Sequence, residues 1–583
     1  MSIFKKLGWF FKQEKKSYII GVTFLILVAL VQLIPPRVIG VVVDEIATGK
    51  MTFATLSKWI LILVAAGIGQ YVFRYIWRLN IWGSAAKLEQ TLRTNLFQHF
   101  TKMDHVFFQK YRTGDLMAHA TNDLSAIQMV AGGGILTLAD SIITGGATII
   151  AMAIFVDWRL TVIALIPLPM LAVASRVLGS KLHVRFRGAQ AAFSTMNDKT
   201  QESISGIKVI KTFGEEAEDV ADFKKQTDNV VEKNKRVYLV DSLFDPAITF
   251  IMGISYVLTI ILGGKYVMSG AISIGQLISF ISYIAMLVWP MFAIGRLFNI
   301  LERGSASYDR VQELLTEKSS IIENPDAIQQ LVKGDIDYKV DEFNYPEDDR
   351  VALNHIHFNL KRGRTLGIVG KTGSGKTTMF KLLLREYDEY QGEIRFGTHD
   401  IRDYSLNALL HGIGYVPQDQ FLFSTTIREN IRFANPELSE EDVIKAAKLT
   451  AIHEDIMGLP LGYDTLVGER GVSLSGGQKQ RISIARALIT NPELLILDDA
   501  LSAVDAKTEE AILSALKTER AQQTTIIAAH RISSVMHGDE IIVLDDGEVI
   551  ERGNHQELVE LNGWYQDMFD RQQLEAELKG GAK

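Results

Sequence analysis

Long apolar runs dominate the chain up to about residue 300, and the charged positions in that part are grouped between the runs. A hydrocarbon core about 30 Å thick is crossed by roughly 20 residues of helix, which is the length of these runs. They lack strand-like alternation, and only helices or closed barrels satisfy their backbone groups in lipid. We therefore predict six membrane-spanning helices. Their expected bounds are 17–43, 57–83, 135–156, 159–179, 243–268 and 271–300.

Basic residues between the runs predict the orientation of these helices. Lysines crowd the segment before the first run, and Lys and Arg are frequent in the long stretches 84–134 and 177–242. Positively charged segments stay on the cytoplasmic side of a membrane. We expect the N-terminus and both stretches there, and the composition of the stretches predicts helices that continue the spans beyond the lipid.

The pattern changes near residue 320. A charged, helix-like stretch over 301–330 gives way to alternating, strand-like sequence from Ile336. We place the domain boundary there, with a transmembrane domain over 1–320 and a second domain over 321–583. The predicted fold is a membrane all-α domain of six helices followed by an α/β domain.

Composition adds little to this picture. The 583 residues include no cysteine, which excludes disulfides and thiolate metal sites. The net charge of −7 is small for a chain of this length and indicates no nucleic-acid partner. The hydrophobic fraction of 47% is high for a wholly soluble protein, as six spans require.

The second domain contains a P-loop pattern over Gly370–Thr377, between a strand-like segment and a helix-like segment. Its glycines allow backbone N–H groups to converge on phosphates at a helix N-terminus. In this motif Lys376 reaches the β- and γ-phosphates, and the Thr377 hydroxyl binds Mg²⁺. The pattern predicts ATP and Mg²⁺ as ligands of the second domain.

Further motifs follow in a fixed order. An apolar strand over 494–497 ends in Asp498, in the form of a Walker B element that would help hold Mg²⁺. The others are Tyr415-Val416-Pro417-Gln418, Leu474-Ser475-Gly476-Gly477-Gln478, Ser502-Ala503-Val504-Asp505, and His530 at the end of an apolar strand. This ordered set resembles the ATP-binding cassette (ABC) family. Together with the six runs, it resembles a half-transporter of the multidrug exporter type.

The resemblance implies a role for each motif. Tyr345 is similar to the aromatic residue that stacks on adenine, although a structural strand tyrosine is the alternative. Gln418 would contact Mg²⁺ and sense the membrane domain, His530 would contact the γ-phosphate, and Glu469 would lie in a segment that relays motion. The residues expected to bind nucleotide in their own chain are Tyr345, Gly370, Thr372, Gly373, Ser374, Gly375, Lys376, Thr377 and Thr378.

The segment Leu474–Gln478 would instead contact ATP held by a second cassette, with Asp505 in the adjoining D-loop. One chain carries one cassette, so the resemblance implies a dimer. The acid after Asp498 is usually Glu in this family, but here it is Asp499, one methylene shorter. We favour a heterodimer in which this site hydrolyses ATP weakly and the partner has the usual Glu. The alternative is a homodimer with slow ATPase activity.

Several residues within the spans are candidates for a substrate cavity. Charged side chains there are costly and usually face a cavity or an ionic partner. For Asp140 we weigh contact with a cationic substrate against a structural pair with an arginine, and for the apolar candidates we weigh a cavity lining against packing. The candidates are Asp140, Met286, Trp289, Phe292 and Arg296, with Arg74 and Arg78 as further charged positions.

The resemblance predicts a bacterial plasma-membrane exporter that moves amphipathic, drug-like compounds outward by alternating access. Its short helices at 107–116 and 205–213 would couple the two domains. Alternatives are a lipid or peptide flippase, and a regulatory ATP-binding subunit or ATP-gated pore. The sequence does not identify the substrate.

Overall fold

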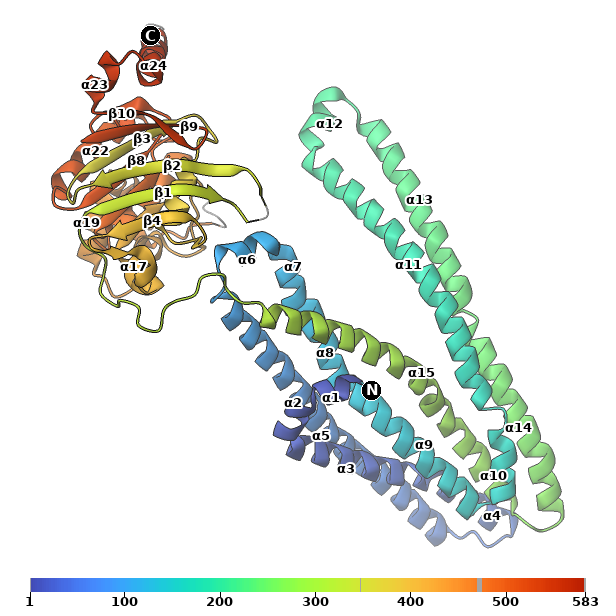
Figure 1. Ribbon diagram of the computed structural model, residues 1–583. Helices are drawn as coiled ribbons and strands as arrows, with labels where there is room; N and C mark the ends of the chain where they lie inside the picture. Colours follow the sequence, from blue (N-terminus) through green and yellow to red (C-terminus); the bar gives the residue numbers. More distant parts are fainter. Residues whose placement is uncertain (1, 347, 469–473, 581–583) are drawn as a thin grey trace. The chain divides into compact units, whose positions relative to one another are not determined.

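The computed structural model describes residues 2–346, 348–468 and 474–580. They form two compact units, one of Met1–Thr101 with Thr113–Glu317 and one of Lys102–Arg112 with Lys318–Lys583. The first unit is helical, and the second combines helices with two sheets (Figure 1).

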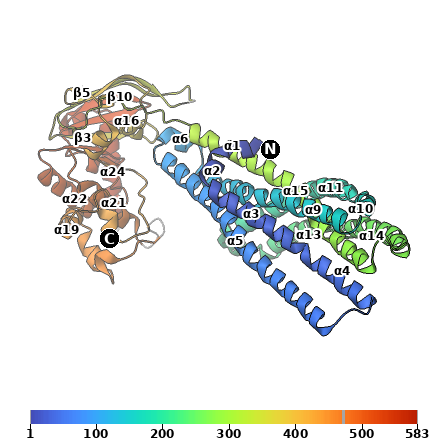
Figure 2. The ribbon, with the colours of Figure 1, turned by 90° about the horizontal axis from the view of Figure 1, so that it is seen from below.

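Six helical segments in the described residues are long and apolar enough to cross a membrane, as predicted (Figure 2). Their bounds are Lys15–Ala47, Phe53–Phe100, Thr113–Phe155, Trp158–Ser205, Glu216–Met268 and Ile274–Met291. The helices of the first unit are α1 (Ser2–Lys6), α2 (Gly8–Gln13), α3 (Lys15–Gln32), α4 (Ile34–Ala47), α5 (Phe53–Phe100), α7 (Thr113–Ala118), α8 (Leu124–Met129), α9 (Ile135–Phe155), α10 (Trp158–Leu165), α11 (Pro169–Ser205), α12 (Ile207–Phe213), α13 (Glu216–Asp241), α14 (Phe244–Met268) and α15 (Ile274–Thr316). Two π-helical turns, His119–Asp123 and Val130–Gly134, join α7, α8 and α9.

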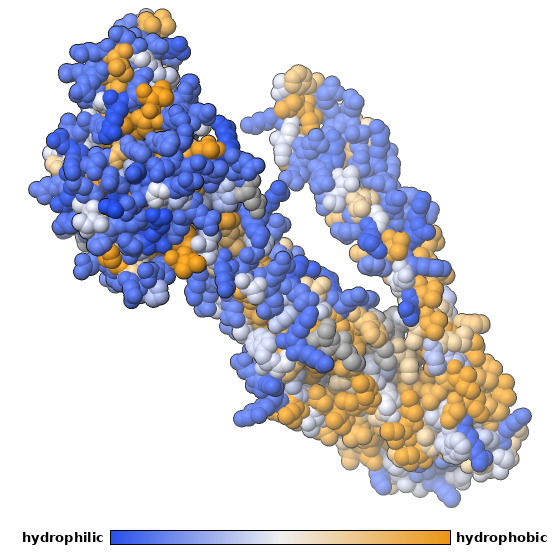
Figure 3. Space-filling view, viewed as in Figure 1, coloured by the Kyte–Doolittle hydropathy of each residue, from blue (hydrophilic) through white to orange (hydrophobic). Residues whose placement is uncertain are grey.

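Apolar side chains cover one part of this unit's surface. Figure 3 shows them gathered where α9, α10 and α14 lie, whereas the far parts of α11 and α13 are mainly hydrophilic. The exposed side chains in the apolar part include Ile142, Ile154, Val162 and Ile261. An exposed apolar belt of this kind suits contact with lipid.

The first and last spans pack backbone to backbone. A Cβ atom added to Gly275 of α15 would lie 1.8 Å from the Gly40 carbonyl oxygen of α4. The Asp44 carboxylate accepts hydrogen bonds from the Gly275 N–H at 2.7 Å and from the Ser273 hydroxyl. Farther along α15, the Ser279 hydroxyl donates to the Pro36 carbonyl at 2.8 Å. Glycine at both contact positions therefore permits the close approach of α4 and α15.

The second unit has one four-stranded and one six-stranded sheet. The four-stranded sheet has the order β2-β1-β4-β5 and is antiparallel, and the six-stranded sheet has the order β10-β9-β3-β8-β7-β6. The strands are β1 (Ile336–Asn344), β2 (Val351–Leu360), β3 (Thr365–Gly370), β4 (Gln391–Phe396), β5 (His399–Asp400), β6 (Ile413–Val416), β7 (Leu494–Asp498), β8 (Thr524–Ala528), β9 (Glu540–Asp545) and β10 (Glu548–Gly553).

Buried parallel strands form the centre of the six-stranded sheet. Strands β3, β7 and β8 are almost wholly buried, which explains their nearly continuous apolar sequences. The helices of this unit are α6 (His105–Lys110), α16 (Lys376–Leu383), α17 (Leu406–His411), α18 (Ile427–Ile431), α19 (Glu440–Leu449), α20 (His453–Met457), α21 (Gly476–Leu488), α22 (Ala506–Glu519), α23 (His555–Glu560) and α24 (Trp564–Gly580). The carboxyl ends of parallel strands share one edge, where ligands of open α/β sheets bind.

Helix α6 packs in the second unit although its sequence lies far from the rest of that unit. Its N-cap residue, Asp104, accepts hydrogen bonds from the Phe107 N–H and the Ser319 hydroxyl, each at 2.9 Å, and from the Ser320 hydroxyl at 2.7 Å. Burial alone would raise the pKa of Asp104, but these hydrogen bonds stabilise the carboxylate, and the pKa is lowered overall. Our predicted boundary at 320 did not foresee that residues 102–112 belong with the second unit.

Candidate functional site

A cleft of about 340 Å³ lies at the carboxyl edge of the six-stranded sheet. The loop after β3, the end of β7, the segment after β8, the loop between β1 and β2 and the turn between β9 and β10 all contribute to it. Its lining residues are Tyr345, Asp348, Arg350, Val351, Ala352, Thr372, Gly373, Ser374, Gly375, Lys376, Thr377, Thr378, Gln418, Asp498, Asp499, His530, Asp546 and Gly547. Every residue predicted to bind nucleotide in its own chain lines this cleft except Gly370.

The loop after β3 has the backbone that a phosphate-binding loop needs. Gly375, the N-cap of α16, has φ +103° and a Cβ atom there would lie 2.8 Å from a Leu353 side-chain atom. The Lys376 ammonium donates hydrogen bonds to the carbonyls of Gly370 at 2.9 Å and Lys371 at 2.8 Å. Burial lowers the pKa of Lys376, while the carboxylates of Asp498 and Asp499 act in the opposite direction. A buried cation at a helix N-terminus suits an anionic phosphate.

Asp498 and Thr377 form a pair of oxygen donors inside the cleft. The Thr377 hydroxyl donates to the Asp498 carboxylate at 2.8 Å, and the Tyr415 hydroxyl donates at 3.4 Å. Burial raises the pKa of Asp498, since ionisation places a charge in a poorly solvated position. Gln418 lines the same cleft. Hydroxyl, carboxylate and amide oxygens are the hard donors that fit Mg²⁺.

Asp499 follows directly and adopts a left-handed backbone conformation, with φ +48°. Its N–H donates to the Ala528 carbonyl at 2.8 Å, so the turn is attached to β8. Its side chain is half-buried and lines the cleft. Among the described residues, no side chain donates a hydrogen bond to its carboxylate.

Tyr345 lines the cleft from the start of the loop between β1 and β2. Its hydroxyl lies 2.8 Å from the Thr378 hydroxyl, and the Lys381 ammonium lies 5.4 Å from the centre of its ring. The edge of the Tyr387 ring contacts it, with centroids 5.5 Å apart. The ring is therefore held in a fixed orientation beside the P-loop helix.

His530 reaches the cleft from the end of β8, and helix α24 fixes its backbone. The Gln572 side chain donates to the His530 carbonyl at 2.8 Å and accepts from the Ile532 N–H at 2.9 Å. Sequence reasoning missed Gln572, because a polar residue on a charged helix carries no motif. It also missed Arg350, which pairs with Asp546 at 2.7 Å on the rim of the cleft.

The segment Leu474–Gln478 does not line its own chain's cleft. Ser475 is the N-cap of α21, and its hydroxyl accepts a hydrogen bond from the Gln478 N–H at 3.3 Å. A Cβ atom on Gly477 would lie 2.8 Å from the Ala503 carbonyl oxygen. Leu474 is half-buried against a cluster of buried apolar residues, and Gly476 begins α21. Glu469 lies outside the described residues.

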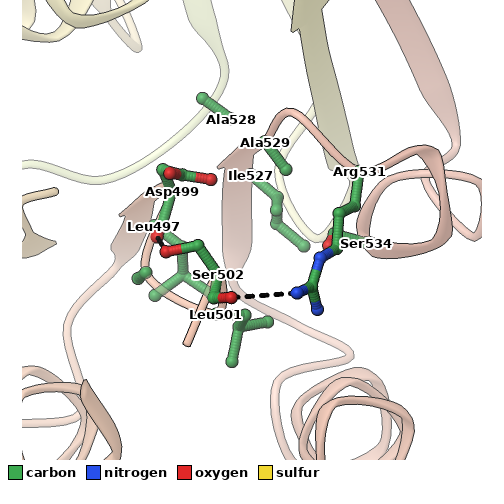
Figure 4. A pocket seen from close by; sticks show the side chains of 10 residues that line it. Leu497, Asp499, Leu501, Ser502, Ile527, Ala528, Ala529, Arg531 and Ser534 are labelled. Atoms are coloured by element: carbon green, nitrogen blue, oxygen red, sulfur yellow. Dashed lines mark hydrogen bonds between the residues drawn. The ribbon is translucent and has the colours of Figure 1, made fainter. Parts of the chain in front are cut away.

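Hydrogen bonds connect helix α21 to the loop after Asp499. The Gln480 side chain donates to the Ser502 hydroxyl at 3.0 Å and accepts from the Ala503 N–H at 2.9 Å. Arg531, next to His530, donates to the Ser502 carbonyl at 3.0 Å, as Figure 4 shows. Asp505 caps α22 by accepting from the Thr508 N–H at 3.1 Å. The loop containing Asp499 is thus attached both to α21 and to the residue after His530.

The first unit contains a separate cleft of about 780 Å³ among α3, α5, α9 and α15. Asp140, Met286 and Trp289 line it together with Arg74 and Arg78. The Asp140 carboxylate accepts a hydrogen bond from the Thr144 hydroxyl at 2.8 Å. Among the described side chains, no arginine lies within ion-pair distance of Asp140. The side chains of Phe292 and Arg296 are outside the described part of the chain.

Comparison with known proteins agrees with both units. Residues 18–291 match the family model "ABC transporter transmembrane region", and residues 353–502 match the model "ABC transporter". The chain is 44% identical over 581 residues to the probable multidrug resistance ABC transporter ATP-binding/permease protein YheI of Bacillus subtilis, with 100% of this chain and 99% of that protein covered. It is 42% identical to the multidrug resistance-like ATP-binding protein MdlA of Escherichia coli, over 99% of this chain and 98% of that one.

A solved structure has the same fold. The structure of a bacterial Atm1-family ABC exporter with ATP bound superimposes with a TM-score of 0.78 at 26% identity. It covers 96% of this chain and 98% of the other. The predicted order of a six-helix membrane domain and an α/β domain is therefore confirmed.

Proposed function

The chain belongs to the ABC exporters, as a multidrug-resistance-like member with fused transmembrane and ATP-binding domains, and we propose that it is the degenerate-site subunit of a heterodimer. By this we mean the subunit whose own ATP site hydrolyses ATP weakly. It is a multi-pass membrane protein with ATPase and translocase activity. The observation that carries the proposal is Asp499, which lines the cleft where the family usually has Glu.

The short side chain of Asp499 accounts for weak hydrolysis at this site. Its backbone is fixed by the Asp499 N–H to Ala528 hydrogen bond, so the chain does not advance to compensate for the missing methylene. A misplacement of about 1 Å costs on the order of a hundredfold in rate. The cleft otherwise retains Gln418 and His530, so ATP binding is preserved while the attacking water is poorly oriented.

The intact segment Ser475–Gln478 assigns the chain a second role. It lies outside its own cleft, Ser475 caps helix α21, and Gly477 packs closely against the backbone of Ala503. In the dimer it completes the ATP site of a partner half-transporter that has the usual Glu. This arrangement resembles the BmrC subunit of the bacterial BmrC–BmrD exporter.

A partner is also supported by helix α12. Ile207, Val209 and Phe213 on this short helix are exposed, with Phe213 exposed to 75%. Exposed apolar residues at the tip of an otherwise hydrophilic pair of helices suit a protein contact. We assign this contact to the cassette of the partner subunit.

Mg²⁺ would be held by Thr377, Gln418 and Asp498, whose oxygens share the cleft. When bound it would neutralise charge on the β- and γ-phosphates. Lys376 would release its two carbonyl acceptors and pair with phosphate oxygens, and Tyr345 would stack on the adenine.

The transported compounds are small and amphipathic, on this proposal, and enter the cleft among α3, α5, α9 and α15. That cleft combines Trp289 and Met286 with the charges of Asp140, Arg74 and Arg78. Aromatic and thioether side chains adapt to varied apolar shapes. On this proposal the N-terminus and the ATP-binding domain lie in the cytoplasm of a bacterial cell and the spans cross its plasma membrane; the basic segments next to the spans support this orientation, because such segments stay on the cytoplasmic side.

The test compares ATP hydrolysis by the purified full chain with that of its Asp499→Glu variant and of the chain mixed with a candidate partner. We expect low turnover by the chain alone, an increase of about tenfold to a hundredfold for Asp499→Glu, and a similar increase with the partner. High turnover by the unmixed wild type that Asp499→Asn abolishes would instead establish an active homodimer. Turnover that stays low in every combination while ATP still binds would establish a regulatory subunit.

A further inference from the structure

A second cluster of polar side chains lies on the hairpin of β1 and β2, and none of its members lines the nucleotide cleft. Asp341, His355 and His357 each offer one ligand atom, and these atoms all lie within 4.8 Å of one another. His357 Nε2 is 2.9 Å from Asp341 Oδ1, and His355 Nδ1 is 4.0 Å from the same oxygen.

The backbone of the hairpin brings these three side chains together. Val340 pairs with Ile356, and Glu342 pairs with Asn354, so Asp341 faces His355 across the two strands. His355 has a left-handed conformation with φ +49°, one that histidine adopts more often than most residues. His357 is two residues farther along β2, which places its side chain on the same face.

From this geometry we propose that Asp341, His355 and His357 bind one Zn²⁺ ion. Imidazole nitrogens and carboxylate oxygens bind zinc at about 2.0–2.2 Å, which corresponds to ligand atoms about 3.3 Å apart in a tetrahedron. The three side chains are 42% to 72% exposed. They are therefore able to rotate into that arrangement, and water occupies the fourth position.

The same donors do not suit Mg²⁺, the ion expected at the ATP site. Mg²⁺ requires near-octahedral oxygen ligands, whereas two of these three donors are imidazole nitrogens. Imidazole ligands suit zinc, copper and nickel, and the affinity of such a site is higher for copper than for nickel or zinc. Mg²⁺ at any concentration that supports ATP binding is thus a poor competitor for the hairpin site.

Zinc on the hairpin has a structural consequence for the nucleotide cleft. The loop between β1 and β2 carries Tyr345, Asp348 and Arg350, which line that cleft. A metal bridge from Asp341 on β1 to two residues on β2 joins the two strands behind this loop. We infer that the ion stabilises the hairpin that presents Tyr345.

The experiment uses the full chain without a polyhistidine tag, stripped of metal with a chelator and reconstituted in lipid nanodiscs. Zn²⁺ binding is measured by calorimetric titration, and Co²⁺ is used as a spectroscopic probe of imidazole coordination. We expect one Zn²⁺ per chain, and a loss of affinity of at least about tenfold in His357→Gln and in Asp341→Asn. His399→Gln, which removes an exposed histidine from β5 of the same sheet, is the matched control and should leave the affinity unchanged.

Thermal unfolding gives a second measurement. Zn²⁺ should raise the melting temperature of the wild type and of His399→Gln, but not that of the triple variant Asp341→Asn/His355→Gln/His357→Gln. In the absence of Zn²⁺, Mg²⁺-dependent ATP binding should be equal in all of these proteins, which shows that the variants are folded. Equal Zn²⁺ affinity in the wild type and the triple variant would overturn the proposal, and so would an equal loss in His399→Gln.

Discussion

The side-chain amide of Gln572 donates a hydrogen bond to the carbonyl oxygen of His530 over 2.8 Å. The same side chain accepts from the Ile532 N–H, so one residue of helix α24 holds the backbone on both sides of Arg531. His530 lines the nucleotide cleft, and Gln572 does not. The last helix of the chain thus positions a residue of the ATP site without touching the ATP site itself.

Replacing Gln572 should therefore slow hydrolysis more than it weakens ATP binding. Gln572→Leu loses two hydrogen bonds, each contributing about 1 kcal/mol, and frees the turn that carries His530. We expect single-turnover hydrolysis in the Asp499→Glu background to fall about tenfold, with ATP affinity changed less than about twofold. Gln573→Leu removes the neighbouring exposed amide and serves as the control. Equal rates for the two variants would show that the contact with His530 has no positioning role.

The raised pKa of Asp498 predicts how stability depends on pH in the absence of nucleotide and Mg²⁺. Burial raises this pKa, so the folded state binds the proton more tightly than the unfolded state, and stability falls as pH rises through the folded value. Asp498→Asn removes the charge and should melt at a higher temperature than the wild type at pH 7. The difference should shrink as pH falls towards the unfolded value of about 3.9. Mg²⁺-ATP should stabilise the wild type and not the variant.

The contact of Gly40 and Gly275 leaves no room for a side chain. A Cβ atom on Gly275 would lie 1.8 Å from a backbone oxygen of α4, so the two helices must separate in Gly275→Ala. Overpacking of this kind costs about 1–3 kcal/mol or more. We expect a melting temperature lower by several degrees in detergent. Gly146→Ala is the control, because no atom lies within 4 Å of its added Cβ position.

Asp140 should affect the choice of transported compound more than the assembly of the protein. Its described neighbours include a hydroxyl donor, Thr144, and no paired arginine, so Asp140→Asn leaves no buried cation without a partner. We expect normal expression and melting temperature, with weaker stimulation of ATP hydrolysis by cationic compounds. Stimulation by neutral compounds should be unchanged. A lower melting temperature in Asp140→Asn, with unchanged stimulation by cationic compounds, would instead assign Asp140 a structural role.

The sequence was sufficient for the parts of the fold that depend on local patterns. Apolar length alone predicted six spans, and motif order predicted that Lys376, Thr377, Asp498 and His530 would come together. These predictions work because parallel strands bring their carboxyl ends to one edge. Asp499 lies at this edge for the same reason, because it directly follows the end of β7.

Other features depend on contacts between distant segments. Residues 102–112 join the second unit through Asp104 and Ser320, more than 200 residues apart along the chain. Gln572 reaches His530 from another helix, and Asp341 meets His355 only because β1 and β2 pair in one register. No periodicity or motif in the sequence predicts these particular contacts, since each side chain acquires its role from a tertiary neighbour.

The attachment of α4 to α15 also limits how the first unit can change shape. A slip of one residue between helices is about 1.5 Å, and such a slip would break the bonds that Asp44 and Ser279 make across this contact. These hydrogen bonds oppose sliding, so we expect α4 and α15 to move together as one rigid body. If the cleft that α15 borders widens or narrows, we expect α5 and α9 to move relative to that rigid body.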